Sequence, residues 1–131
     1  MMAPTPNYQQ QYLKAKVETA SPGDLTLLLY EELHRKLNMA RVLYQKGQFS
    51  EMMDRLHGAR SILYEFIATL NFEYEISHQL RQLYDYYIRR IGDFAVNKDI
   101  SILDEVIEFA REYTDTWRQA LAQVKSAKGK S

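Results

Sequence analysis

Apolar residues recur at the spacing of an amphipathic helix in four successive stretches of the chain. Leucine, isoleucine, valine and aromatic side chains follow one another at intervals of three and four residues, which places them on one helical face. Local signals mark the ends of these stretches, among them Ser21-Pro22 as a start and Lys46-Gly47 as a stop. The predicted helices cover about 21–46, 49–71, 76–97 and, after a cap at Asn97 or Asp99, 100–124.

Four helices joined by short links predict an all-α protein, an antiparallel up-down four-helix bundle. All prolines lie at or before position 22, so none interrupts the later helices. A chain of 131 residues can bury one hydrophobic core without disulfides or metals. We therefore predict one bundle at 21–125, preceded by a mobile N-terminal leader or short cap helix at 1–20 and followed by a disordered tail at 126–131.

The leader is too polar to form a core and too aromatic for a simple solvated tail. It carries Tyr8, Tyr12 and Val17 around a glutamine run. We interpret it as a movable cover, or gate, for a binding surface, and a frayed terminus is the alternative.

The apolar stripe of the fourth predicted helix is broad, about 160° at 100° per residue. It includes Trp117, the only tryptophan. Two interpretations stay open: the helix lies deep in the bundle, or it keeps apolar surface for a partner.

Composition excludes several functional classes. There are no cysteines, so thiol chemistry and disulfides are excluded. Lys plus Arg and Asp plus Glu both number 17, and this balance gives no field that would gather nucleic acid or an anionic membrane. No apolar run approaches the length of a membrane span, and the amino terminus lacks the pattern of a signal peptide. We expect a cytoplasmic protein that binds no nucleic acid and does not insert into a membrane.

Each of the three histidines follows an acidic residue by three positions, the spacing of helical di-iron sites. On its own helix, however, each histidine lies about 130° to 160° from the mean apolar direction. We therefore expect all three to face solvent and predict no metal site. The pairs are Glu31 with His34, Asp54 with His57, and Glu75 with His78.

An exposed histidine on a helical bundle could instead carry a phosphoryl group. His57 is the candidate, because Gly58 leaves room for a docking partner and Arg60 could stabilise a phosphate. Histidine phosphotransfer modules usually place a Lys-Gly pair three and four residues after the histidine, and here those positions are Arg60 and Ser61. A phosphate-carrying signalling bundle is therefore the second functional hypothesis, and we expect no enzyme and no cofactor.

Tyrosine is unusually frequent, with 10 in the chain. A tyrosine ring with its polar end suits a groove that is sometimes wet and sometimes covered. Tyr84 and Tyr87 point with the apolar stripe of the third predicted helix and are expected in the core, whereas Tyr86 points away from it.

Together with these tyrosines, several separated motifs resemble the flagellin-specific export chaperones of bacteria, the FliS family. The resemblance extends from Tyr12 to about Ala120. It rests on Tyr12, Val17, TASPGDLTLLLY at 19–30, TLNFEYEIS at 69–77, LYDYYIRR at 83–90, KDISILDEV at 98–106 and Asp115-Thr116-Trp117.

The resemblance implies a non-catalytic chaperone of flagellum biogenesis and type III protein export. Such chaperones are antiparallel helical bundles that hold the C-terminal segment of flagellin, which is unfolded before it polymerises. They prevent premature filament assembly in the cytoplasm and deliver flagellin to the export gate, whose cytoplasmic domain is the second partner. In this family the leader packs on the bundle and is displaced by flagellin, and a cargo-free homodimer is a further expectation.

From the motifs shared with the family we predict cargo-contacting residues in the leader and on the bundle. A core position is the alternative for each bundle residue. The predicted set is Tyr8, Tyr12, Val17, Leu25, Leu28, Ile76, Leu80, Leu83 and Tyr84.

Overall fold

The computed structural model describes residues 22–129, and the side chains of residues 22–127. Within this range the chain forms four helices and no strand. The elements are α2 (Pro22–Gln45), α3 (Phe49–Ala68), α4 (Glu75–Asn97) and α5 (Ile100–Gly129). The predicted cap at Ser21 lies outside the described residues.

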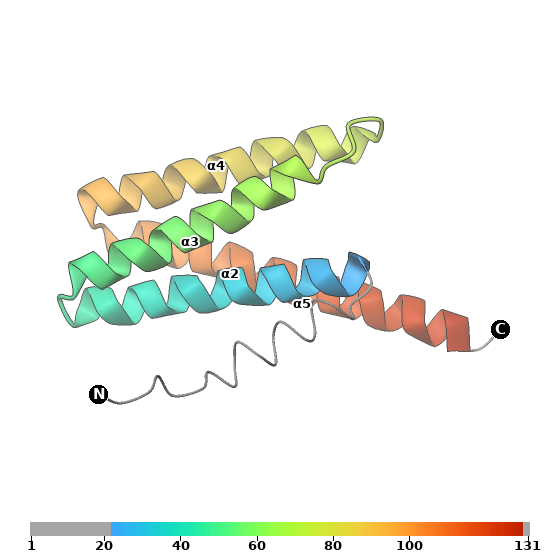
Figure 1. Cartoon of the computed structure of the whole chain (residues 1–131), viewed down its shortest axis with the longest axis horizontal. Coiled ribbons are helices and arrows are strands. Elements are labelled where there is room, and N and C mark those ends of the chain that lie inside the picture. The colour runs from blue at the N-terminus through green and yellow to red at the C-terminus, as the bar shows by residue number, and fades with distance from the viewer. Residues whose placement is uncertain (1–21, 130–131) are drawn as a thin grey trace, which may run out of the picture.

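The helices form the predicted all-α up-down bundle. Each helix runs back along its predecessor, and α2 packs against α3 and α5 while α4 also packs against α3 and α5 (Figure 1). Short links explain this order, because two to six residues between helices allow only neighbouring antiparallel placement.

Local backbone chemistry sets the boundaries between the helices. Gly47 has φ +72°, a left-handed conformation that favours glycine, and the Gln48 N–H donates to the Leu43 carbonyl at 2.9 Å. Of the two predicted caps for α5, Asp99 is used, because its Oδ1 accepts from the backbone N–H of Ser101 at 3.0 Å. The first predicted stop and this cap are therefore confirmed.

Two helix ends differ from the sequence expectation. Helix α3 ends at Ala68, before Asn71, and the Thr69 hydroxyl donates to the Phe66 carbonyl at 2.9 Å, a local bond that competes with further helix. Helix α5 continues to Gly129, past the expected boundary at residue 125. Its last turns combine Ala with Gln and Lys, which are good helix formers, and glycine comes only at the end.

The hydrophobic core occupies one part of the bundle. Fully buried apolar side chains lie at 30–43 on α2, 52–66 on α3, 84–94 on α4 and 102–110 on α5. Ion pairs tie the helices together around this part: Arg41 binds Asp104 at 2.6 Å, and Arg90 binds Glu105 at 2.9 Å. We call this region the packed part.

Candidate functional site

Beyond the packed part, at the end of the bundle that holds the α3–α4 link, the helices still carry apolar residues but bury none of them. We call this region the apolar end and define it as residues 22–29, 67–83 and 115–127. Ser77 is the only fully buried side chain in these ranges. Apolar surface that its own fold leaves uncovered is typical of a site for a partner.

All four helices contribute to the apolar end. Leu29 of α2, Ile67 of α3, Leu80 of α4 and Trp117 of α5 are partly buried and pack against the edge of the core. Ile76, in the first turn of α4, is 59% exposed. Because these residues come from every helix, the apolar end is a property of the whole bundle and not of one amphipathic face.

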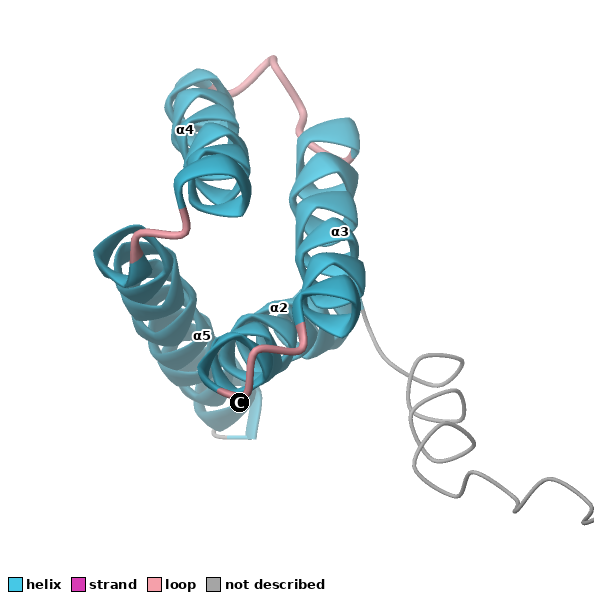
Figure 2. Ribbon diagram, turned by 90° about the vertical axis from the view of Figure 1, so that its left-hand side faces the viewer, coloured by secondary structure: helices cyan, strands magenta, loops and turns pink. Residues whose placement is uncertain are grey.

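The arrangement of the helices explains the partial burial. Toward this end, α2 and α5 diverge from α3 and α4, whereas the helices lie closer together at the opposite end (Figures 1 and 2). A leucine on α2 or α5 therefore has fewer side chains of α3 and α4 to pack against.

Within the diverging end, α2 and α5 stay in contact. The Trp117 indole N–H donates to the Gly23 carbonyl at 2.9 Å, and Lys125 pairs with Asp24 at 2.9 Å. A Cβ at Gly23 would lie 2.8 Å from Leu121 Cδ2, so a larger residue there would require the Leu121 side chain to shift.

A layer of aromatic rings separates the apolar end from the packed part. The Phe66 ring lies tilted against the rings of Tyr30 and Tyr84, with centroids 4.4 Å and 5.4 Å away. The two tyrosine hydroxyls form a hydrogen bond of 2.5 Å. Burial raises the pKa of both hydroxyls above the usual value, so both stay protonated.

The link between α3 and α4 shapes the rim of the apolar end. Asn71 Oδ1 accepts from the Glu73 N–H at 3.0 Å, which tightens the turn. The Phe72 ring lies against the His78 ring, with centroids 5.2 Å apart, and Arg81 stands over it. Tyr74 is left 65% exposed beside Ile76, so the rim offers further apolar contact area.

The structure brings most of the predicted bundle residues to one region. Leu25, Leu28, Leu80 and Leu83 are partly buried at the apolar end, and Ile76 is exposed there. Tyr84 is buried in the aromatic layer. The leader residues Tyr8, Tyr12 and Val17 lie outside the described residues.

The predicted set omitted several apolar residues of the apolar end. Leu29, Ile67 and Leu70 are partly buried at the same end as the predicted leucines. Leu29 and Leu70 lie within the motifs at 19–30 and 69–77, and Ile67 precedes the second of these. All three belong to the apolar stripes of the predicted helices, which is the signal that could have found them.

Two of the three histidines are exposed to solvent, as expected, and one is half-buried. His57 and His78 are exposed, as predicted, and Arg60 Nη2 lies 3.0 Å from His57 Nδ1. His34 is instead half-buried, because charged side chains of α5 stand beside it, and burial lowers its pKa below the usual value. Among the described residues, no three His, Asp or Glu side chains gather closely enough to hold a metal ion.

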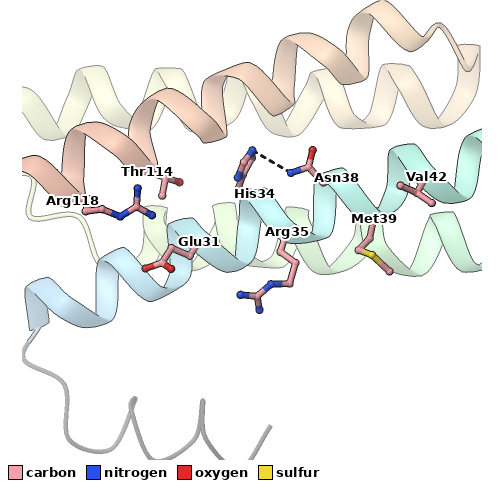
Figure 3. A pocket seen from close by; sticks show the side chains of 8 residues that line it. All are labelled: Glu31, His34, Arg35, Asn38, Met39, Val42, Thr114 and Arg118. Atoms are coloured by element: carbon pink, nitrogen blue, oxygen red, sulfur yellow. Dashed lines mark hydrogen bonds between the residues drawn. The ribbon is translucent and has the colours of Figure 1, made fainter. Parts of the chain in front are cut away.

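His34 lines a depression of about 380 Å³ on the outer face of α2 and α5 (Figure 3). His34 Nε2 and Asn38 Nδ2 lie 3.2 Å apart across one side of it. Most of the residues that line it are polar or charged, unlike those of the apolar end. Its lining residues are Glu31, His34, Arg35, Asn38, Met39, Val42, Thr114 and Arg118.

No helix in the described range is long and apolar enough to span a bilayer. The model of the family "Flagellar protein FliS" matches residues 4–124. The chain belongs to the FliS family. Its curated relatives in this family carry the name flagellar secretion chaperone, a class of protein that is not an enzyme class.

The relatives are distant in sequence and similar in length. The chaperone of Bacillus subtilis is 31% identical over 110 residues, 84% of this chain and 83% of its own. That of Vibrio cholerae is 27% identical over 114 residues, 86% and 84% of the two chains. That of Salmonella typhimurium is 29% identical over 115 residues, 86% and 85%. The family match at residues 4–124 covers the packed part and nearly all of the apolar end.

Proposed function

We propose that this FliS-family chaperone binds the C-terminal segment of flagellin at its apolar end. The observation that supports this proposal is the distribution of burial. Apolar residues continue along all four helices beyond the aromatic layer, and none of the apolar residues beyond that layer is fully buried. Bound flagellin would cover this surface, and its own apolar residues would be kept from premature polymerisation in the cytoplasm.

Partial burial suits a chaperone that must release its cargo. Covering apolar surface contributes about 25 cal/mol per Å². Residues such as Leu80 and Leu83 are already half covered by their own bundle, so each adds less than a fully exposed leucine would. Ordering a disordered segment opposes binding as well, which keeps the net affinity below what the contact area alone would give.

Residues 1–20 act, in this proposal, as a displaceable cover of the apolar end. Tyr8, Tyr12 and Val17 would occupy it when flagellin is absent, and the free protein could otherwise form a homodimer through the same surface. The loaded complex then docks on the cytoplasmic domain of the flagellar type III export gate.

Two substitutions on α4 test the cargo site. Ile76 is 59% exposed at the apolar end, and Val96 is 81% exposed at the opposite end of the same helix. We expect Ile76→Asp to weaken binding of a flagellin C-terminal peptide roughly tenfold or more, because a carboxylate would be buried in the contact. Val96→Asp is the matched control and should bind like wild type.

The readout is isothermal titration calorimetry, with circular dichroism to show that both variants are folded. Equal affinities for the two variants would contradict the proposed site. Co-purification with full-length flagellin, but not with flagellin that lacks its C-terminal segment, tests the cargo itself.

A further inference from the structure

The hydroxyls of Tyr30 and Tyr84 form a polar centre inside the aromatic layer. They come from α2 and α4, the helices on opposite corners of the bundle, and lie 2.5 Å apart. Each tyrosine is only 4% exposed, and Phe66 and Tyr113 rings lie close to Tyr30, with centroids 4.4 Å and 6.2 Å away. A hydroxyl pair in such apolar surroundings is costly unless its hydrogen-bonding capacity is used.

The two hydroxyls do not use all of their hydrogen-bonding capacity. Each neutral tyrosine hydroxyl carries one proton to donate. When one hydroxyl donates to the other, the accepting hydroxyl still has its own proton, and no oxygen or nitrogen of the described residues accepts it. A buried donor without an acceptor costs free energy, so an acceptor supplied from outside would be bound favourably.

The position of the pair determines where such an acceptor would come from. Tyr30 directly follows the α2 part of the apolar end, and Tyr84 directly follows the α4 part. The aromatic layer is therefore the last buried layer before the apolar end. A hydroxyl proton can turn toward that end by rotation about the C–O bond, with no movement of the ring.

We propose that the Tyr30–Tyr84 pair donates this second hydrogen bond to an oxygen of the bound segment. The acceptor is a main-chain carbonyl, such as those left free in the last turn of a helix, or a Ser, Thr, Asn or Gln side-chain oxygen. The pair thereby selects a segment that presents one oxygen within an otherwise apolar surface, and it fixes the register of that segment on the bundle. This inference rests on the proposed function, because it assigns a recognition group within the same site.

The test uses the double variant Tyr30→Phe, Tyr84→Phe, which removes both hydroxyls and keeps both rings. Tyr44→Phe is the matched control: the Tyr44 hydroxyl donates to the Lys98 carbonyl at 3.0 Å, far from the apolar end. Thermal unfolding and titration with a flagellin C-terminal peptide are measured for both variants and for wild type.

We expect the double variant to unfold at the wild-type temperature or above it, because it no longer buries a hydroxyl proton without an acceptor. It should bind the peptide about fivefold more weakly, because the hydrogen bond to the segment is lost. Tyr44→Phe should bind like wild type. Equal affinity of the double variant and wild type would overturn the inference and leave the proposed function intact. If wild type itself does not bind the peptide, the proposed function fails. If the double variant does not fold, the single variant Tyr84→Phe is titrated instead. Its remaining Tyr30 hydroxyl has no acceptor in the pair and can donate to the segment, so the peptide should bind at least as tightly as to wild type, and a fivefold loss of affinity would overturn the inference.

Discussion

Trp117 shows how a single side chain can connect the apolar end to the core. The sequence places it in the apolar stripe of the last helix, and the structure confirms that it packs against the core, although only partly buried. Its indole N–H donates to the Gly23 carbonyl, 94 positions earlier in the chain, and so holds the first turn of α2 against α5. The residue therefore has a packing role and a hydrogen-bonding role that substitution can separate.

Replacing Trp117 by Phe should lower the free energy of unfolding by about 1 kcal/mol, because the ring stays and the hydrogen bond is lost. Trp117→Ala should cost about 2 kcal/mol, below the 3–5 kcal/mol typical of a fully buried Trp. Urea denaturation followed by circular dichroism measures both. Equal losses for the two variants would show that the hydrogen bond, and not packing, carries the whole effect.

At the scale of helices, the sequence predicts helix boundaries that depend on local chemistry. It does not predict how deeply each apolar side chain is buried. Gly47 and Asp99 mark helix boundaries through their own backbone or side chain, and both were found. Leu80 and Tyr84 share one helical face and look equivalent in the pattern, yet Tyr84 is buried and Leu80 is only half covered. Their difference depends on how far the neighbouring helices diverge, which no single helix encodes.

The turn between α2 and α3 allows a prediction at this scale. Gly47 has φ +72°, and a Cβ there would meet no atom within 4 Å. Gly47→Ala should therefore cost about 1 kcal/mol through backbone strain alone. Gly47→Asn should cost less, because Asn adopts the left-handed conformation more readily.

Thermal unfolding of both variants, with flagellin-peptide binding as a second measurement, checks this prediction. Binding should be unchanged, since Gly47 lies at the opposite end of the bundle from the proposed site. A variant that keeps its stability but loses affinity would place cargo contacts at that opposite end.

Over the whole molecule, the proposed function divides stability and binding between two regions. The packed part holds every fully buried apolar side chain of the described residues, together with ion pairs between helices such as Arg41 with Asp104. The apolar end holds no fully buried apolar side chain, so we expect substitutions there to affect association more than folding. Under the proposed function, this division would let one small bundle stay folded while its binding surface is covered and uncovered in turn.

Deleting residues 1–20 tests whether the leader covers the apolar end. We expect the truncated protein to stay folded and to self-associate, because exposed apolar surface buries itself in a second copy. Analytical ultracentrifugation should show a larger solution mass than for the full chain, and adding the flagellin C-terminal peptide should restore a one-to-one complex. Combining the deletion with Ile76→Asp should weaken the self-association, whereas Val96→Asp should not. A truncated protein that remains monomeric and binds the peptide with unchanged affinity would mean that the leader is a passive tail.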